Sequence, residues 1–125
     1  MTTPALPKPT DAELSILQIL WKLGSATVKE VKDVLGEGTG YTTVLKFLQI
    51  MTEKGLVQRD ESQRAHIYEA TLSKELTQQQ LVTGLLKKAF EGSTSKLVMQ
   101  ALASQKATPD ELAEIRKLLE ELTKK

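Results

Sequence analysis

The residues best suited to chemistry lie on one face of a helix expected over residues 41–54. Apolar residues recur there at helical spacing, and Gly55 follows as a C-terminal stop. The opposite, outward face has hydroxyl side chains near its start and longer side chains one turn later. These outward residues are Thr42, Thr43, Lys46, Gln49 and Ile50. A helix that enters the DNA major groove needs this order, because its N-terminal end comes closest to the bases.

Each of these side chains has a partner on duplex DNA. Gln49 can form paired hydrogen bonds with adenine, and Lys46 can reach guanine or a phosphate. Methyl groups of threonine and of Ile50 can pack on thymine methyls. The alternative is an ordinary solvated helix face. Leu45 and Ile50, expected to be exposed at its margins, favour a binding surface, since a solvated face rarely carries such residues.

A β-hairpin is expected after this helix, because the hydrophobic pattern alternates on both sides of the turn 61–63. Arg59, Gln63, Arg64 and His66 lie near its tip. In such a wing we expect Arg64 and His66 to contact phosphate or the minor groove. Asp60 and Glu61 at the same turn oppose this, and an ordinary cross-strand polar position is the alternative for His66.

Threonine-led capping boxes mark where the surrounding helices begin. Thr10 and Thr27, each followed three residues later by glutamate, predict helices over 11–23 and 28–35, and Glu13 and Glu30 are interpreted as capping residues. Thr108 with Pro109 predicts a helix to about residue 123. Helices over 74–90 and 96–103 lie between. Three helices followed by a hairpin predict a mainly α fold, a winged helix-turn-helix with a C-terminal helical segment.

Apolar spacing also predicts which helical residues point inward. For the first helix these are Leu14, Ile16 or Ile19, Leu17, Leu20, Trp21 and Leu23. For the second they are Val28, Val31, Val34 and Leu35, and for the third Val44, Phe47, Leu48 and Met51.

We expect two regions, a winged-helix DNA-binding domain over 1–72 and a helical dimerisation region over 73–125. The second carries more apolar side chains than three short helices can bury, so pairing with a second copy is expected. The residues assigned to this interface are Leu85, Leu86, Phe90, Leu97, Val98, Leu102, Ile115, Leu119 and Leu122. The alternative is a tail that folds back on the winged helix.

Composition excludes several classes of protein. There is no cysteine and only one histidine, so disulfides, a metal site and a bound cofactor are not expected. No catalytic triad or phosphate-binding loop is present, which argues against an enzyme. Apolar runs are too short for membrane insertion, and a cytoplasmic protein is expected. Residues 1–70 carry a net charge of −1, so the placement of the charges has to provide any affinity for nucleic acid.

Five motifs together resemble the penicillinase repressor family of the BlaI/MecI type, and the resemblance spans nearly the whole chain. They are TDAE at 10–13, ILW at 19–21, GYTTV at 40–44, EKGLV at 53–57 and AHIY at 65–68. The resemblance implies a homodimeric repressor on a palindromic operator in duplex DNA. Members of its antibiotic-responsive branch are inactivated by proteolysis that a membrane-bound sensor peptidase triggers.

Two sites depart from the family pattern, the expected cleavage site and one position of the contact helix. The expected cleavage site falls at Gln100 and Ala101, where the antibiotic-responsive members have Asn-Phe. Ile50 stands where an arginine is common late in the recognition helix. The copper-responsive relatives carry a C-terminal cysteine motif, so the absence of cysteine excludes copper sensing.

The leading hypothesis is an operator-binding repressor. The alternative is a winged-helix module that binds a protein partner, which a flat salt response would favour.

Overall fold

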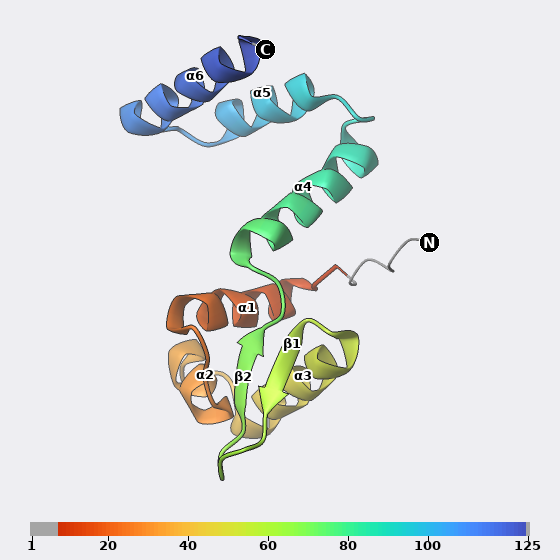
Figure 1. The fold of residues 1–125 in the computed structure, drawn as a ribbon, viewed down its shortest axis with the longest axis vertical. Coiled ribbons are helices and arrows are strands. Elements are labelled where there is room, and N and C mark those ends of the chain that lie inside the picture. Colours follow the sequence, from red (N-terminus) through yellow and green to blue (C-terminus); the bar gives the residue numbers. More distant parts are fainter. Residues whose placement is uncertain (1–7, 125) are drawn as a thin grey trace. The chain divides into compact units, whose positions relative to one another are not determined.

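The expected order of helices and strands is confirmed in the computed structural model, which describes residues 8–124 (Figure 1). The elements are α1 (Asp11–Leu23), α2 (Val28–Leu35), α3 (Tyr41–Lys54), β1 (Val57–Asp60), β2 (Ile67–Ala70), α4 (Lys74–Ala89), α5 (Thr94–Ser104) and α6 (Pro109–Thr123). The fold is therefore mainly α with a small antiparallel hairpin. The largest difference in a boundary is at the start of α5, two residues before the expected position, where the Ser93 hydroxyl accepts the Lys96 N–H at 3.3 Å. α4 ends one residue earlier and α5 one residue later than expected.

The capping boxes set the starts of α1, α2 and α6. At each site the threonine hydroxyl accepts the N–H of the glutamate, and the glutamate side chain accepts the N–H of the threonine. The distances at Thr27 and Glu30 are 3.2 and 2.9 Å. These contacts satisfy amides that the first helical turn leaves without partners. Local sequence alone therefore determines where these three helices begin.

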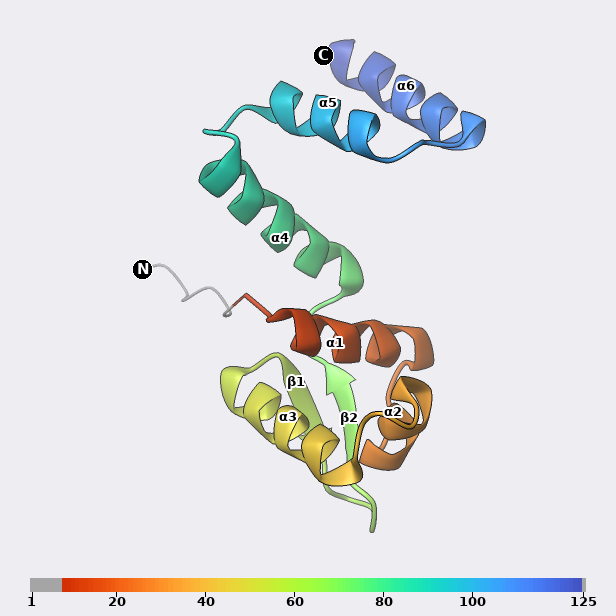
Figure 2. The ribbon, with the colours of Figure 1, turned by 180° about the vertical axis from the view of Figure 1, so that it is seen from behind.

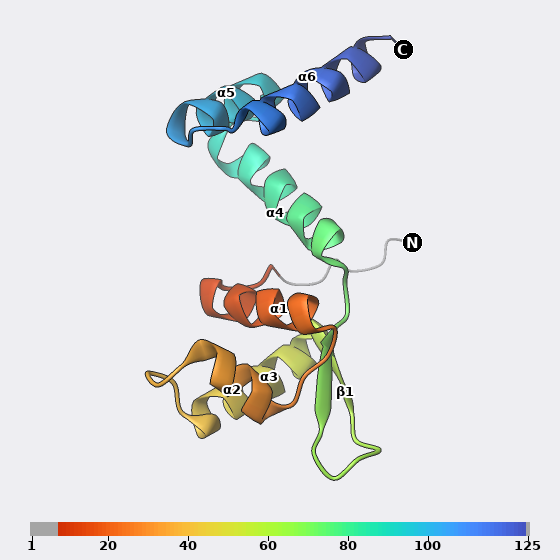
Figure 3. The same ribbon diagram turned by 90° about the vertical axis from the view of Figure 1, so that its left-hand side faces the viewer.

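The hairpin is fixed along β2 by a third segment of chain. β1 pairs antiparallel with β2, with Arg59 opposite Tyr68. On the other side of β2, Ala26 exchanges two backbone hydrogen bonds with Tyr68, at 2.8 and 2.9 Å. The Tyr68 side chain is 1% exposed. This pairing joins the loop between α1 and α2 to the wing, whose tip extends beyond α2 and α3 (Figure 3).

The core lies between α1, α2, α3 and the hairpin, and the strands lie on one side of the three helices (Figures 1 and 2). Its fully buried members include Leu20, Val31, Val44, Leu48 and Met51. Two residues expected in this core are exposed instead, Leu23 at 46% and Val34 at 58%. Both lie in the last turn of their helices, so the apolar spacing continues past the end of the core.

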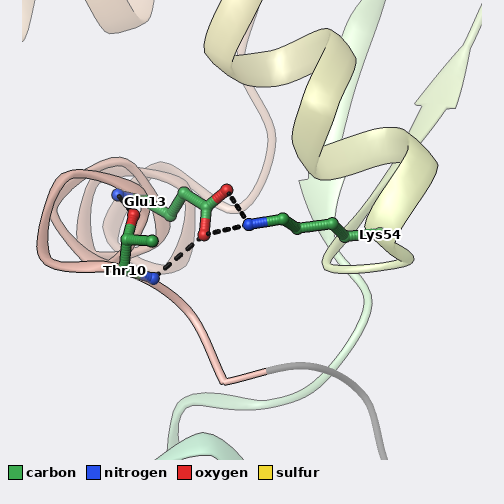
Figure 4. Close-up of polar contacts among 3 residues, drawn as sticks. All are labelled: Thr10, Glu13 and Lys54. Carbon is green, nitrogen blue, oxygen red and sulfur yellow. Dashed lines mark hydrogen bonds and ion pairs between the residues drawn. The ribbon is translucent and has the colours of Figure 1, made fainter.

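Glu13 has a second role besides capping. Its carboxylate is buried and accepts two hydrogen bonds from the Lys54 ammonium, at 2.9 and 3.1 Å, while it also accepts the Thr10 N–H at 2.9 Å (Figure 4). The start of α1 is thereby joined to the end of α3. Burial alone raises the pKa of Glu13. The Thr10 backbone N–H, the Lys54 ammonium and the Thr10 hydroxyl outweigh that effect and hold its pKa below the ordinary value.

The described residues divide into two compact units, one up to Val82 and one from Thr83, so the division falls within α4. In the first unit, the Trp21 indole donates to the Leu72 carbonyl at 3.0 Å. That bond holds the chain beyond the hairpin against α1. The predicted functional boundary at residue 72 stays a prediction. None of the helices in residues 8–124 is long and apolar enough to cross a membrane.

Replacing Glu13 with Gln should destabilise the first unit by about 1–3 kcal/mol at pH 7, because Lys54 loses its carboxylate and a charge-assisted bond becomes neutral. The stabilisation comes from a carboxylate whose pKa is lowered by folding. It is therefore present above the unfolded pKa of about 4.3 and is lost as the pH falls through the folded value. Denaturant unfolding of both proteins from pH 7 to pH 3 measures this. An unchanged difference at pH 3 would contradict the assignment.

Candidate nucleic-acid interface

The rotation of α3 turns the predicted contact residues outward. Val44, Leu48 and Met51 have no exposed surface, which places the opposite face of the helix in solvent. Gly40 precedes the first turn, and Gly55 adopts a left-handed φ of 83° that ends the helix after Lys54. The Glu13–Lys54 ion pair joins that end to α1. The C-terminal end of the helix and its buried stripe are therefore fixed.

The outward face forms a hollow of about 380 Å³, which we call the helix hollow, and four of the five predicted α3 residues line it. They are Thr42, Thr43, Lys46 and Ile50, together with Phe47. Gln49 is exposed and lies one turn after Lys46. Phe47, expected to point inward, is only partly buried and serves both the core and the helix hollow. The surface combines one cation with methyl and aromatic groups.

The expectation that Leu45 is exposed at the margin of α3 is wrong. It is partly buried and packs against the core. Ile50 is likewise only partly exposed. The reason is that both lie at the sides of α3, between the buried stripe and the outward face. The apolar character of the interface therefore comes from Ile50 and Phe47, not from Leu45.

The wing pairs most of its charges internally. The Glu61 carboxylate lies 3.3 Å from Arg59 Nη2 and 3.8 Å from His66 Nε2. Asp60 accepts the Ser62 N–H at 2.8 Å, and hydrogen bonds from the Ser62 side chain and backbone lower the pKa of that carboxyl. Arg64 has no ion-pair partner within residues 8–124. The structure thus leaves Arg64 as the available wing cation and places His66 beside a carboxylate.

A second hollow of about 370 Å³, the wing cavity, brings Arg64 and His66 next to the starts of α2 and α3. Its lining residues are Thr27, Val28, Lys29, Tyr41, Leu45, Arg64, Ala65, His66 and Tyr68. Sequence reasoning did not identify Lys29 and Tyr41. No local pattern marks them, because the wing reaches them only through the long-range pairing of Ala26 with Tyr68. No cluster of three metal-ligating side chains occurs within the described part of the chain.

Apolar residues remain uncovered on α4, α5 and α6. Leu85, Leu119 and Leu122 are each at least half exposed, and Val98 and Leu102 are over a third exposed. Leu86, Phe90, Leu97 and Ile115 are partly buried. Met99, Leu112 and Leu118 are also exposed but were not among the predicted interface residues. No residue of α5 or α6 is buried.

Gln100 and Ala101, the predicted cleavage position, lie inside α5 and are exposed. Their backbone is helical. A peptidase needs extended chain in its active site, so cleavage here requires local opening of α5.

Comparison with known proteins gives a family and a fold. The sequence profile of the family described as "Penicillinase repressor" matches residues 9–121. A penicillinase repressor of Bacillus licheniformis is 22% identical over 118 residues, which cover 93% of this chain and 92% of that protein.

Two solved structures share the fold. The YusO protein of Bacillus subtilis matches with a TM-score of 0.55 at 18% identity, over 92% of this chain and 74% of that chain. A mutant of MarR from E. coli, complexed with operator DNA, matches with a TM-score of 0.52 at 20% identity, over 91% of this chain and 75% of that chain. At these identities the likeness concerns the fold alone, and it confirms the expected winged helix.

Truncation of two neighbouring residues of α3 should change the free energy of unfolding by very different amounts. Leu48→Ala should lower the free energy of unfolding by about 2–5 kcal/mol, because the side chain is fully buried. Gln49→Ala should change it by less than about 0.5 kcal/mol, since that side chain is exposed. Urea unfolding followed by circular dichroism compares them. Equal losses in both variants would mean that the helix is rotated differently.

Proposed function

Because this chain belongs to the penicillinase repressor family of transcriptional repressors, we propose that it binds a palindromic operator in duplex DNA as a homodimer. The observation that carries the proposal is the outward face of α3, where Thr42, Thr43, Lys46 and Ile50 surround one hollow and Gln49 follows. Among residues 8–124, none of these side chains is needed to fill the core. A regulator that binds operator DNA acts where that DNA is, in the cytoplasm.

α3 supplies the base contacts in this proposal. Thr42 and Thr43 stand in the first turn, where the helix backbone comes closest to the base edges. Lys46 donates to guanine or to a phosphate, and Gln49 pairs with adenine. Ile50 replaces a second long donor with an apolar group, so this end of the face favours a thymine methyl over guanine.

The wing supplies phosphate contacts, and the placement of acidic groups makes this possible in a half of the chain with a net charge of −1. Glu13 is buried against Lys54, Glu30 caps α2, and Asp60 is bonded within the turn. Glu61 lies beside Arg59 and His66. Arg64 and Lys29 are left without acidic partners in the described chain, on the same side of α3. Both are suited to backbone phosphates.

Truncating Lys46 or Gln49 to Ala should weaken binding to the specific operator by about 1–3 kcal/mol, because each loses a contact to the DNA. Lys22→Ala, which removes an exposed lysine from the last turn of α1, serves as the charge-matched control and should leave specific binding within about twofold. Fluorescence anisotropy on a labelled duplex provides the affinities. Unchanged affinity in both α3 variants would remove this face from the interface.

The homodimer is proposed to form through the C-terminal helices. The apolar residues Ile115, Leu119 and Leu122 of α6 are spaced at four and three positions, so they lie on one face of the helix. Leu118 and Leu122 are more than half exposed. A second copy presents the same face, and pairing the two removes this apolar surface from water.

Leu119→Arg should weaken the dimer by about 2–4 kcal/mol, because it removes buried apolar surface and places a charge in the interface. Ala113→Arg puts the same side chain on another face of α6 and is the matched control. Both positions are exposed within one chain, so the fold of the protomer should not change. Sedimentation velocity over a concentration series reports the dimer. Equal dimerisation of the two variants would place the interface elsewhere.

Release from DNA is proposed to follow proteolysis between Gln100 and Ala101, triggered by a membrane-bound sensor peptidase. Cleavage there detaches α6, with Leu119 and Leu122, while α3 stays intact. Repression is then lost because the dimer is lost. The support for this step is the family resemblance together with the exposure of both residues on α5.

If local opening of α5 limits the cleavage, Ala103→Gly should speed it about two- to fivefold, because glycine lowers helix stability by about 0.5–1 kcal/mol. Ala113→Gly in α6 is the control for a glycine placed outside α5. The intact mass of the repressor is followed in cells exposed to a β-lactam. Derepression with the chain at full length, or a cut outside residues 94–104, would show a different route of release.

A further inference from the structure

The wing cavity has the size and lining of a small-molecule site. Its volume of about 370 Å³ falls within the range of ligand sites, roughly 300–1,000 Å³. Three segments distant in sequence form it, namely the start of α2, the start of α3 and the distal part of the wing. The backbone pairing of Ala26 with Tyr68 holds the first and third of these together, so the cavity is built into the fold.

The inner surface of the wing cavity is apolar. Val28 and Tyr68 are 5% and 1% exposed, so they form a fixed floor that is already removed from water. Leu45 is partly buried beside them, and Tyr41 adds a half-exposed aromatic ring at the edge. The apolar area of Tyr41 and Leu45 that is still exposed can be removed from water by a flat hydrocarbon group.

The charged groups around the cavity have one sign. Lys29 and Arg64 line it, no Asp or Glu is among its lining residues, and neither cation has an ion-pair partner in residues 8–124. The nearest acids in sequence are engaged elsewhere, since Glu30 accepts the Thr27 N–H at 2.9 Å and Glu61 lies beside Arg59 and His66. An anion at the cavity is therefore attracted by two cations and repelled by no lining carboxylate.

We propose that the wing cavity binds a small organic anion with an apolar body, of the aromatic carboxylate class. A bare phosphate would satisfy Lys29 and Arg64 but leave the exposed surface of Tyr41 and Leu45 uncovered. A neutral hydrocarbon would cover Tyr41 and Leu45 but leave the cations without a partner. An aromatic carboxylate does both, with its ring against Tyr41 and Leu45 and its carboxylate near the two cations.

A bound anion also opposes DNA binding, a consequence that rests on the proposed function. It occupies Arg64 and Lys29, which otherwise meet backbone phosphates, and it lies beside Tyr41, directly before the base-contacting Thr42. The carboxylate of the ligand and the phosphates of the DNA backbone compete for the same two cations. The ligand therefore releases the repressor from its operator without cleavage of the chain.

The test uses full-length ¹⁵N-labelled protein and 2-naphthoate as the probe, with neutral 2-naphthamide and inorganic phosphate as comparison ligands. Naphthoate should shift the amide signals of residues 27–29, 41–45 and 64–68. The amide and phosphate should each bind at least about tenfold more weakly. Lys29→Ala combined with Arg64→Ala should reduce naphthoate affinity about tenfold or more. Lys22→Ala combined with Lys87→Ala, which removes the same charge away from the cavity, should not.

Three results would overturn the binding site: shifts confined to α5 and α6, naphthamide that binds as tightly as naphthoate, or phosphate that does so. Displacement from a labelled operator duplex is measured separately. Naphthoate that binds the cavity but leaves the operator complex intact would overturn the competition. If the protein binds no operator, the proposed function fails, while the amide shifts still decide whether the cavity binds the anion.

Discussion

Val44, Leu48 and Met51 are buried without residual exposure, so α3 can pack in only one rotation against α2 and β1. With that rotation fixed, Thr42, Lys46 and Gln49 have to face solvent, and Ile50 and Phe47 have to lie at the edge of the same surface. The C-terminal end of the helix is held by Gly55 and by the bond from Lys54 to Glu13. A DNA-reading helix needs this rigidity, because hydrogen bonds to base edges tolerate little displacement.

The placement of charged side chains explains how a domain with almost no net charge could bind nucleic acid. Four acids of the first unit are used inside the structure: Glu13 and Glu30 at helix starts, Asp60 in the turn and Glu61 beside Arg59. Lys46, Arg64 and Lys29 keep their charge available around α3. The net charge of a domain therefore says little about its capacity to bind DNA, because the placement of charges around the contact helix matters more.

Most of the fold follows from short-range sequence signals, because caps and glycine stops act over three or four residues. Thr10, Thr27 and Thr108 set helix starts that the structure confirms. The prediction that Leu23 and Val34 are buried is wrong, because a hydrophobic period carries no information on where the core ends. The Glu13–Lys54 and Trp21–Leu72 contacts span 41 and 51 residues, so no local pattern predicts them.

The candidate site likewise contains residues that local sequence predicts and residues that only long-range pairing brings into place. The outward residues of α3 could be predicted, since helical spacing fixes which of them share a face. Lys29 and Tyr41 could not, because they join Arg64 only after the wing pairs with the loop before α2. The apolar surface of α5 and α6 was predicted in kind, although Met99 on α5 and Leu112 and Leu118 on α6 extend it beyond the residues assigned to the interface.

The salt dependence of binding to the DNA upstream of its own gene tests the central claim most directly. If Lys29, Lys46 and Arg64 of two protomers contact phosphates, raising the salt concentration from about 50 to 200 mM should weaken binding on the order of 10³-fold. A scrambled duplex should bind far more weakly at every salt concentration. An affinity that barely changes with salt, or that does not distinguish the two duplexes, would contradict an operator-binding repressor and favour a module that binds a protein partner.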